Sequence, residues 1–313
     1  ERASDGTLRI GIFLPLTGAG ASLGPPLIAG VESAVDHINA HGGVFDRPVE
    51  LVSADEGSEG IEVLLAQDVD AIVGPASSLV ALAGLAPAVD ANLGVVTCSP
   101  MATALGLDAY PDNQFFFRTA PSDTLQMYAI ARLAERTGVP DVAVGYLDDP
   151  YGRGLSDAFT DALRDRPLSV GRSVGFSSDQ GDLADVAGSL LAEDPGIVVV
   201  LGDADDGSRL LAALDAATDD PPAIIINDNI RLARQVIQGL SAPFRERLTG
   251  VAPQSHAVGT DNDDLGFFVP HAIDCVNLQL SQYEGLTVAA TQFISSWGGQ
   301  VVSEDGQTAD LGS

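Results

Sequence analysis

Residues 70–84 read "DAIVGPASSLVALAG", and this stretch decides the fold. A short apolar run ends at Gly74-Pro75, and a segment with helical spacing begins at the paired serines Ser77 and Ser78. Buried strands that lead directly into helices are typical of parallel sheets. A helix start carries unpaired N–H groups that suit an anion, whereas one serine there is commonly an N-cap. An N-cap role accounts for one of the two serines. The second serine leaves ligand binding as an alternative interpretation.

The same alternation continues in both directions along the chain. Further apolar, β-rich runs lie at 8–16, 48–55, 94–99, 141–147, 168–176, 196–202 and 222–228. Helical spacing is found at 25–40, 61–67, 79–92, 124–138, 151–165, 183–194 and 207–218. We expect a capped start near Ser122. The pattern predicts an α/β protein in which helices cover both faces of doubly wound parallel sheets, with one series of units before about residue 120 and one after it.

Composition limits the function. The chain has 313 residues, of which 45% are hydrophobic, and this is enough for one large or two medium domains. It has 44 acidic residues against 15 basic ones, all of them Arg, and a net charge of −29. Nucleic acid and anionic lipid are therefore disfavoured as partners. The charge fits either an ordinary solvated surface or adaptation to salt, in which screening relieves self-repulsion.

Neither the chain ends nor the cysteines carry a decisive signal. No apolar run reaches the roughly 20 residues that span a membrane. The start "ERASDG" fits a mature chain after signal removal, or a fragment trimmed at a domain edge. Cys98 and Cys275 fit no C-x-x-C pattern. They could pair in an oxidising compartment or be buried small hydrophobes, and we favour free, buried thiols.

The sequence has no complete motif for catalysis, nucleotide binding or metal binding. The loop "GAGASLG" at 18–24 has Leu23 where a dinucleotide fingerprint needs glycine. No Walker A, G-x-S-x-G or HExxH sequence is present. His37 and His41 lack an evident third ligand, and "DADDGS" at 203–208 departs from the calcium-loop pattern. We therefore expect no catalytic residues, no metal and no cofactor.

Four motifs carry a family resemblance. They are INA-x-GG at 38–43, GP-x-SS at 74–78, SP-x-AT at 99–103 and PYG-x-G at 150–154. In order and spacing the chain resembles the type I periplasmic binding proteins, and more closely the branched-chain-amino-acid (Leu/Ile/Val) substrate-binding family of ABC importers. The similarity covers about residues 8–280.

The resemblance implies a fold and its division. It implies two Rossmann-like, doubly wound lobes of the Venus-flytrap type, joined by a multi-strand hinge, with solute held in the cleft. Lobe 1 would comprise 1–120 plus 251–313, and lobe 2 would comprise 121–250. The segment 56–66 is short for the family's second helix. The family usually ends with strands that cross the hinge again, whereas this sequence stops at "SEDGQTADLGS", so we expect that either the end is missing from the given sequence or the last crossing is.

The resemblance also implies ligand-binding residues. In lobe 1, the hydroxyls of Ser78 and Thr103 match groups that hold the ligand's carboxylate, and the carbonyl of Met101 matches one that faces its ammonium. Ser77 and Ala102 complete these two turns.

In lobe 2, Tyr151 matches a residue that closes over the ligand, and Asp228 matches the acid that receives the ammonium. The alternative for Asp228 is a cap of the helix that begins near Ile230.

Three further positions concern the ligand side chain. Asp203 replaces the aromatic or small residue of many relatives. It could favour a dibasic ligand, or pair with Arg209 or Arg231. Leu23 and Phe268 match positions that line the side-chain pocket, and both could equally be ordinary packing residues.

We therefore expect an extracytoplasmic solute-binding protein, periplasmic or at the cell surface, that delivers an amino acid to an ABC permease in the membrane. Lipid anchoring is left open. One alternative is a ligand-sensing receptor domain of the same fold, and another is a binder of an amide or small carboxylate. A Rossmann-like enzyme lacks the motifs it would need, and the polar loops at the strand ends speak against a purely structural acidic protein.

Overall fold

The computed structural model describes residues 6–18, 20–57, 59–90, 94–252 and 269–284. They form two compact units. Unit 1 comprises the described residues of Glu1–Thr103, Tyr110–Ala120 and Gln254–Ser313, and unit 2 those of Ala104–Ala109 and Pro121–Pro253. The lobe ranges and the hinge inferred from the sequence stay a prediction.

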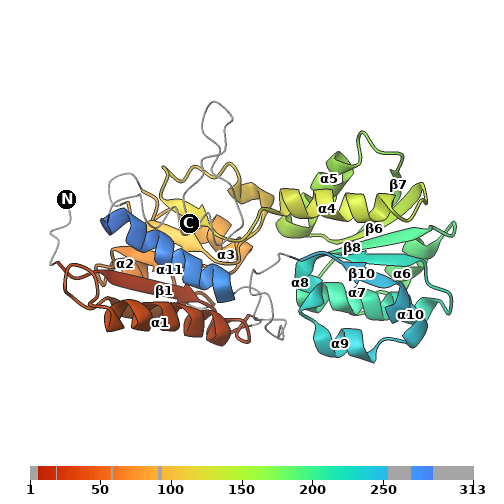
Figure 1. Cartoon of the computed structure of the whole chain (residues 1–313). Coiled ribbons are helices and arrows are strands. Elements are labelled where there is room, and N and C mark those ends of the chain that lie inside the picture. Colours follow the sequence, from red (N-terminus) through yellow and green to blue (C-terminus); the bar gives the residue numbers. More distant parts are fainter. Residues whose placement is uncertain (1–5, 19, 58, 91–93, 253–268, 285–313) are drawn as a thin grey trace, which may run out of the picture. The chain divides into compact units, whose positions relative to one another are not determined.

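Unit 1 contains a five-stranded parallel sheet in the order β2-β1-β3-β4-β5. Its strands are β1 (Arg9–Leu14), β2 (Glu50–Asp55), β3 (Ala71–Val73), β4 (Val96–Ser99) and β5 (Phe116–Arg118). The apolar run that opens the sequence argument is the central strand β3, and all three of its residues are buried. A continuous apolar run suits this place because helices cover both faces of the sheet (Figure 1).

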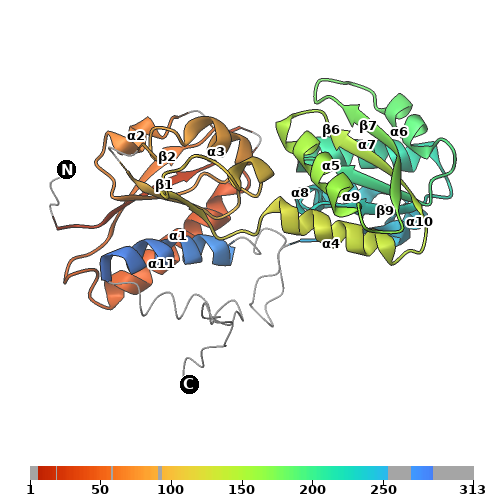
Figure 2. The same cartoon turned by 90° about the horizontal axis from the view of Figure 1, so that it is seen from above.

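Helices α1 and α11 lie side by side on one face of this sheet, and α2 and α3 cover the other (Figure 2). Their bounds are α1 (Gly24–Ala40), α2 (Glu62–Leu65), α3 (Ser78–Gly84) and α11 (Val269–Glu284). Helix α1 has proline in its first turn, as the sequence predicts. The chain leaves it at Gly42 and Gly43, both with positive φ.

Helix α3 is shorter than the predicted helix at 79–92, because it ends at Gly84. Pro87 lacks an N–H group and disfavours helical backbone at Ala86, so the helix stops before this pair. The proline was the signal for this boundary.

Unit 2 repeats the plan with a parallel sheet in the order β10-β9-β8-β6-β7. Its strands are β6 (Asp141–Leu147), β7 (Ser169–Phe176), β8 (Ile197–Leu201), β9 (Ala223–Ile226) and β10 (Leu248–Gly250). Its helices are η1 (Leu105–Leu107), α4 (Asp123–Glu135), α5 (Pro150–Ala162), α6 (Ala184–Leu191), α7 (Ala204–Ala217), α8 (Asp228–Arg231), α9 (Arg234–Gly239) and α10 (Ala242–Arg247). Helices α4 and α5 lie on one face of the sheet, and α6 and α7 on the other (Figure 1). The Ser122 hydroxyl accepts the Thr124 N–H at 3.2 Å, which confirms the predicted cap of α4.

Both sheets have the same strand order, 2-1-3-4-5 when each is numbered from its own first strand. The predicted doubly wound fold is therefore confirmed. In such sheets a ligand site lies at the carboxyl ends of the strands, where the winding reverses between the first and third strands. That point lies between β1 and β3 in unit 1 and between β6 and β8 in unit 2. We call the carboxyl end of each sheet its ligand edge.

Candidate functional site

The two serines at the ligand edge of unit 1 have different partners. Ser77 is the N-cap of α3, and its hydroxyl accepts the Val80 N–H at 3.4 Å. The Ser78 hydroxyl instead accepts the Thr103 N–H at 3.1 Å, across 25 residues of sequence. Ser77 therefore caps helix α3, while Ser78 links the turn after β3 to the turn after β4. The structure thus brings together the two hydroxyl residues Ser78 and Thr103.

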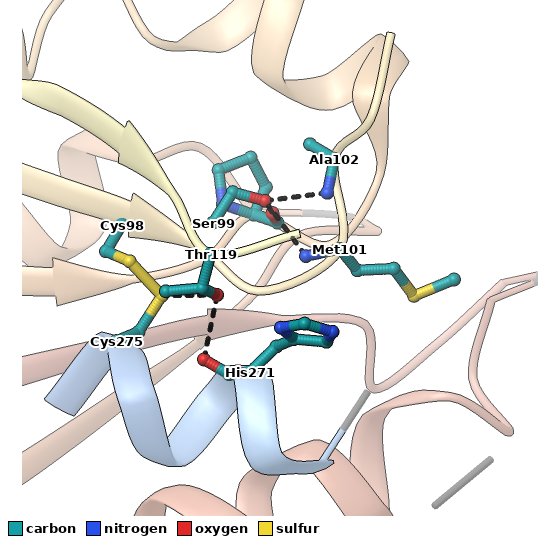
Figure 3. The surroundings of a disulfide bond; sticks show 8 residues. Cys98, Ser99, Met101, Ala102, Thr119, His271 and Cys275 are labelled. Atoms are coloured by element: carbon teal, nitrogen blue, oxygen red, sulfur yellow. Dashed lines mark hydrogen bonds between the residues drawn. A yellow bond between two sulfur atoms is a disulfide. The ribbon is translucent and has the colours of Figure 1, made fainter. Parts of the chain in front are cut away.

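Ser99 fixes the second of these turns from inside. Its buried hydroxyl donates to the Pro75 carbonyl at 2.6 Å and accepts the N–H groups of Met101 (3.3 Å) and Ala102 (2.8 Å). Figure 3 shows Ser99 facing these two residues. The predicted residues Met101, Ala102 and Thr103 are all buried.

The turn after β3 already holds an anionic group of the protein. Glu56, which directly follows β2, accepts the N–H groups of Ala76 at 2.6 Å and Ser77 at 3.1 Å. Its side chain is buried, at 8% exposure. Burial raises the pKa of Glu56 to about 7, although the two N–H groups act to lower it and neighbouring Asp55 raises it. The backbone donors of Ala76 and Ser77, expected from sequence to face an anion, are therefore bound to Glu56.

Asp55 acts in the same way on the loop after β1. Its carboxylate accepts the N–H groups of Leu16 (2.9 Å) and Thr17 (3.3 Å), and also the Thr17 hydroxyl. Asp55 and Glu56 thus hold the two loops that flank the point where the winding reverses. Sequence reasoning missed both, and the signal was a pair of acids directly after an apolar strand.

The side-chain pocket predicted for unit 1 is only partly described. Leu23 is half-buried at the start of α1, where its N–H donates to the Gly20 carbonyl at 2.9 Å. This places it beside the loop after β1, at the ligand edge. Phe268 lies outside the described residues.

In unit 2, Tyr151 is the second residue of α5 and is buried. Its hydroxyl accepts hydrogen bonds from the side-chain amides of Asn229 at 2.8 Å and Asn227 at 3.4 Å. Asn227 also accepts the Gly202 N–H at 3.1 Å and donates to the Gly202 carbonyl at 2.9 Å. One amide thus ties the ends of β8 and β9 to Tyr151. The two asparagines were missed, although "INDN" at 226–229 carries them.

Asp228 is an almost fully buried acid at this edge, with 1% exposure. Burial raises the pKa of Asp228, while hydrogen bonds from the side chain of Gln126 and the N–H of Asn229 act to lower it. Asn227 is the residue in the N-cap position of α8, so the alternative of Asp228 as a helix cap is wrong. Gln126 Oε1 is itself buried and accepts no hydrogen bond from the described residues. Polar atoms therefore gather in the interior at this edge.

Asp203 has a structural role in the described chain. It is the N-cap of α7, and its carboxylate accepts the Asp206 N–H at 2.8 Å. The suggested pairing with Arg209 is wrong, because Arg209 binds Asp206 at 2.7 Å. Burial raises the pKa of Asp203, and the nearby carboxylates of Asp206, Asp205 and Asp149 raise it further.

Cys98 and Cys275 form a disulfide that joins β4 to α11 (Figure 3). The expectation of free thiols was wrong. The two Cα atoms are 5.5 Å apart, but the cysteines are 177 residues apart in sequence, so no local pattern indicates the pairing. Beside the disulfide, the Thr119 hydroxyl donates to the His271 carbonyl at 2.9 Å. Burial lowers the pKa of His271 to about 4, so its imidazole is neutral at pH 7.

The described part of the chain has neither a metal-ion site nor a helix that could span a membrane. It contains no group of three His, Cys, Asp or Glu side chains placed to hold a metal ion. His37 and His41 are exposed, with ring centroids 4.3 Å apart. No helix in the described ranges has the length and hydropathy required to cross a membrane.

Comparison with known proteins agrees with this geometry. A family model described as "Periplasmic binding protein" matches residues 7–265. The chemotactic signal transduction system substrate-binding protein BasB of Halobacterium salinarum is 31% identical over 66% of this chain and 52% of its own length. The Leu/Ile/Val-binding protein BraC3 of Rhizobium johnstonii is 32% identical over 50% and 44%. The chain thus spans about half the length of these relatives.

Among solved structures, the branched-chain amino acid transporter substrate-binding protein LivJ of Streptococcus pneumoniae, in complex with isoleucine, superimposes with a TM-score of 0.74. The two chains are 21% identical, and the match covers 97% of this chain and 92% of LivJ. At this identity the likeness concerns the fold. Together with the family match, it places this chain among the periplasmic binding proteins, a family of extracytoplasmic ligand binders rather than enzymes, and within them it is similar to the type I proteins for branched-chain amino acids.

Proposed function

We propose that this protein captures an amino acid or a similar small zwitterion outside the cytoplasm and delivers it to an ABC permease. The observation that carries the proposal is Asp228, a nearly fully buried acid at the ligand edge of unit 2, in a chain of a solute-binding family. The names of BraC3 and LivJ, which refer to Leu/Ile/Val and to branched-chain amino acids, support the ligand class.

Unit 1 offers the groups that suit a carboxylate. Ser78 and Thr103 lie at adjacent turns of its ligand edge, and the hydrogen bond from the Thr103 N–H to the Ser78 hydroxyl joins the two turns. Hydroxyl groups held by the fold donate to a carboxylate without the cost of ordering them again, and charge-assisted bonds of this kind are the stronger ones. No arginine is needed for this mode of binding.

Unit 2 offers the group that suits an ammonium. A buried carboxylate costs free energy in its ionised form unless a cation accompanies it. The raised pKa of Asp228 expresses this cost in the protein without ligand. An ammonium group of the ligand would compensate this cost. Tyr151, Asn227 and Asn229 lie at the same edge.

Calorimetric titration with Leu, Ile, Val and other amino acids tests the proposal. Asp228→Ala removes one side of a buried ion pair and is expected to weaken binding by about 2–5 kcal/mol. This corresponds to roughly thirtyfold to several thousandfold in Kd. Ser78→Ala removes one charge-assisted hydrogen bond and should cost about 1.5–3 kcal/mol. Asp219→Ala, at an exposed acid close in sequence, is the matched control and should bind like the parent.

The order of the two effects identifies the ligand class. If Asp228→Ala binds an amino acid as tightly as the parent while Ser78→Ala abolishes binding, the ligand has no ammonium at Asp228. A neutral amide or a simple carboxylate would then replace the amino acid in this proposal.

Sensing is a second candidate, because BasB is named as part of a chemotactic signal transduction system. Both functions need the same binding step, so calorimetry does not separate them. Deleting the gene in the source organism does so: loss of ligand uptake supports transport, whereas loss of the chemotactic response with intact uptake supports sensing. A periplasmic or cell-surface location belongs to both, and lipid anchoring is tested by labelling with a radioactive fatty acid.

A further inference from the structure

We propose that Glu56 is a positioning residue of the ligand edge of unit 1, and that binding of an anionic group at Ser78 and Thr103 is coupled to uptake of a proton by Glu56. This inference rests on the proposed function, because it assumes that the ligand carries a carboxylate. It adds a residue that the family resemblance does not include, and a dependence on pH.

The geometry places Glu56 directly behind the ligand-binding turn. Its carboxylate is hydrogen-bonded to the N–H groups of Ala76 and Ser77, and the next residue is Ser78, whose hydroxyl accepts the Thr103 N–H. Each oxygen of the carboxylate accepts one of the two N–H groups. The turn that presents Ser78 is therefore fixed on one side by Glu56 and on the other by Thr103.

Two carboxylates would then share one small region. Glu56 contacts the Ser77 N–H, and Ser78 is the next residue, so a ligand carboxylate at the Ser78 hydroxyl lies on the order of 10 Å or less from the Glu56 carboxylate. This is comparable with the screening distance of about 8 Å at physiological salt, and screening is weaker for buried groups. A like charge at this range disfavours the ionised form of Glu56. Ligand binding therefore raises the pKa of Glu56, which burial has already brought to about 7.

Few other charges act on Glu56. In its own segment, Glu56 follows Asp55, which is buried, and precedes Glu59, whose carboxylate accepts the Asp55 N–H at 3.2 Å. The loop after β1 at 15–18 and the turn at 74–78 contain no titratable side chain. Among the described residues, the contacts of Glu56 are thus backbone donors, and its charged neighbours are acids, so a cation does not hold it ionised.

Coupling has a definite sign. Because the protonated form of Glu56 favours an anionic ligand, affinity should fall as pH rises through about 7. One linked proton changes Kd by at most about tenfold per pH unit, so a loss of roughly threefold to tenfold is expected between about pH 6 and about pH 8. Asp228 gives the opposite sign, because its ionised form binds an ammonium better. A free amino acid keeps both of its charges over this range.

The experiment is calorimetric titration of the parent, Glu56→Gln and Glu59→Gln with the amino acid that the parent binds best, from about pH 6 to about pH 8. Each titration is run in PIPES and in imidazole, which both buffer near pH 7 and whose ionisation heats differ, so that proton uptake is measured directly. Glu56→Gln should show no loss of affinity as pH rises and no proton uptake, and any remaining pH dependence should have the opposite sign that Asp228 gives. Glu59→Gln, at an exposed acid three residues away, should keep the affinity loss and the uptake of the parent.

Proton uptake by the unmutated protein keeps the test valid even if Glu56→Gln folds poorly. A parent that binds an amino acid with the same Kd at both pH values and takes up no proton overturns the inference and leaves the proposed function intact. Retention of the pH dependence in a folded Glu56→Gln variant overturns it as well. If no amino acid or small carboxylate binds at any pH, the proposed function fails, and this inference fails with it.

Discussion

Asp55 and Glu56 are adjacent acids with similar burial but different sets of donors. Asp55 accepts hydrogen bonds from Leu16, Thr17 and Gly57, including a hydroxyl, whereas Glu56 accepts two backbone N–H groups from the described residues. For Glu56 the cost of burial exceeds the gain from its two donors, and its pKa rises. Glu56 therefore supports the ligand-binding turn, but its ionised form lowers the free energy of unfolding.

This cost predicts how stability depends on pH. The pKa of Glu56 is raised from 4.5 to about 7 on folding, so the folded state holds this proton more tightly than the unfolded state. The resulting stability is fully present below about pH 4.5 and is lost as pH rises through about 7, with a total on the order of 3 kcal/mol. Glu56→Gln cannot ionise, so its free energy of unfolding in urea should fall over this window by about 3 kcal/mol less than that of the parent.

Glu59→Gln is again the matched control and should lose stability with rising pH as the parent does. Parallel curves for Glu56→Gln and the parent would show that Glu56 does not carry this effect.

At the scale of elements, the disulfide between β4 and α11 fixes the last described helix to the sheet of unit 1. A crosslink that closes a loop of this length stabilises the fold by about 5 kcal/mol in the chain-entropy estimate, and by less where the unfolded state keeps structure. The double variant Cys98→Ala/Cys275→Ala should therefore have a clearly lower Tm than the parent.

Scanning calorimetry of the double variant and of the parent, each with and without a reducing agent, checks this. Reduction should lower the Tm of the parent toward that of the double variant and leave the double variant unchanged. An equal Tm for the parent and the double variant without reducing agent would contradict the stabilising role.

Some helices, strands and contacts could be predicted from the sequence, and others could not. The strands were predicted because continuous apolar runs, such as Ile197–Leu201, are typical of parallel strands that are covered on both faces of a sheet. The cap at Ser122 was predicted because it depends on residues two or three positions away. The contacts of Glu56 with Ala76, and of Cys98 with Cys275, join distant segments and leave no local pattern. In the candidate site the hydroxyls of Ser78 and Thr103 are predicted from family motifs, and this stays a prediction, while the acids and amides that hold the loops were not predicted.

For the whole molecule, the net charge of −29 leads to a prediction about salt. Acids exceed basic residues by 44 to 15, so at low ionic strength the folded chain repels itself. The screening length falls from about 10 Å at 0.1 M to about 3 Å at 1 M salt. The Tm near pH 7.5 should therefore rise over this range of NaCl. Near the sequence pI of about 4.1 the net charge vanishes, and the increase should shrink.

A Tm near pH 7.5 that stays constant up to molar salt would favour the ordinary solvated surface over adaptation to salt. An equal increase at both pH values would assign the effect to general exclusion of salt from the protein surface rather than to charge.

The chain path has a consequence for synthesis on the ribosome. Unit 2 is almost continuous in sequence, whereas unit 1 combines the first 103 residues with helix α11, which packs against α1 and is bonded to β4. A nascent chain that has emerged to about residue 253 can complete the second sheet, while the first still lacks the helix that covers α1. The part made first is thus finished last. During that interval the apolar face that α11 will cover stays exposed, and this is the period in which a chaperone or a premature pairing of Cys98 with another thiol would act on the protein.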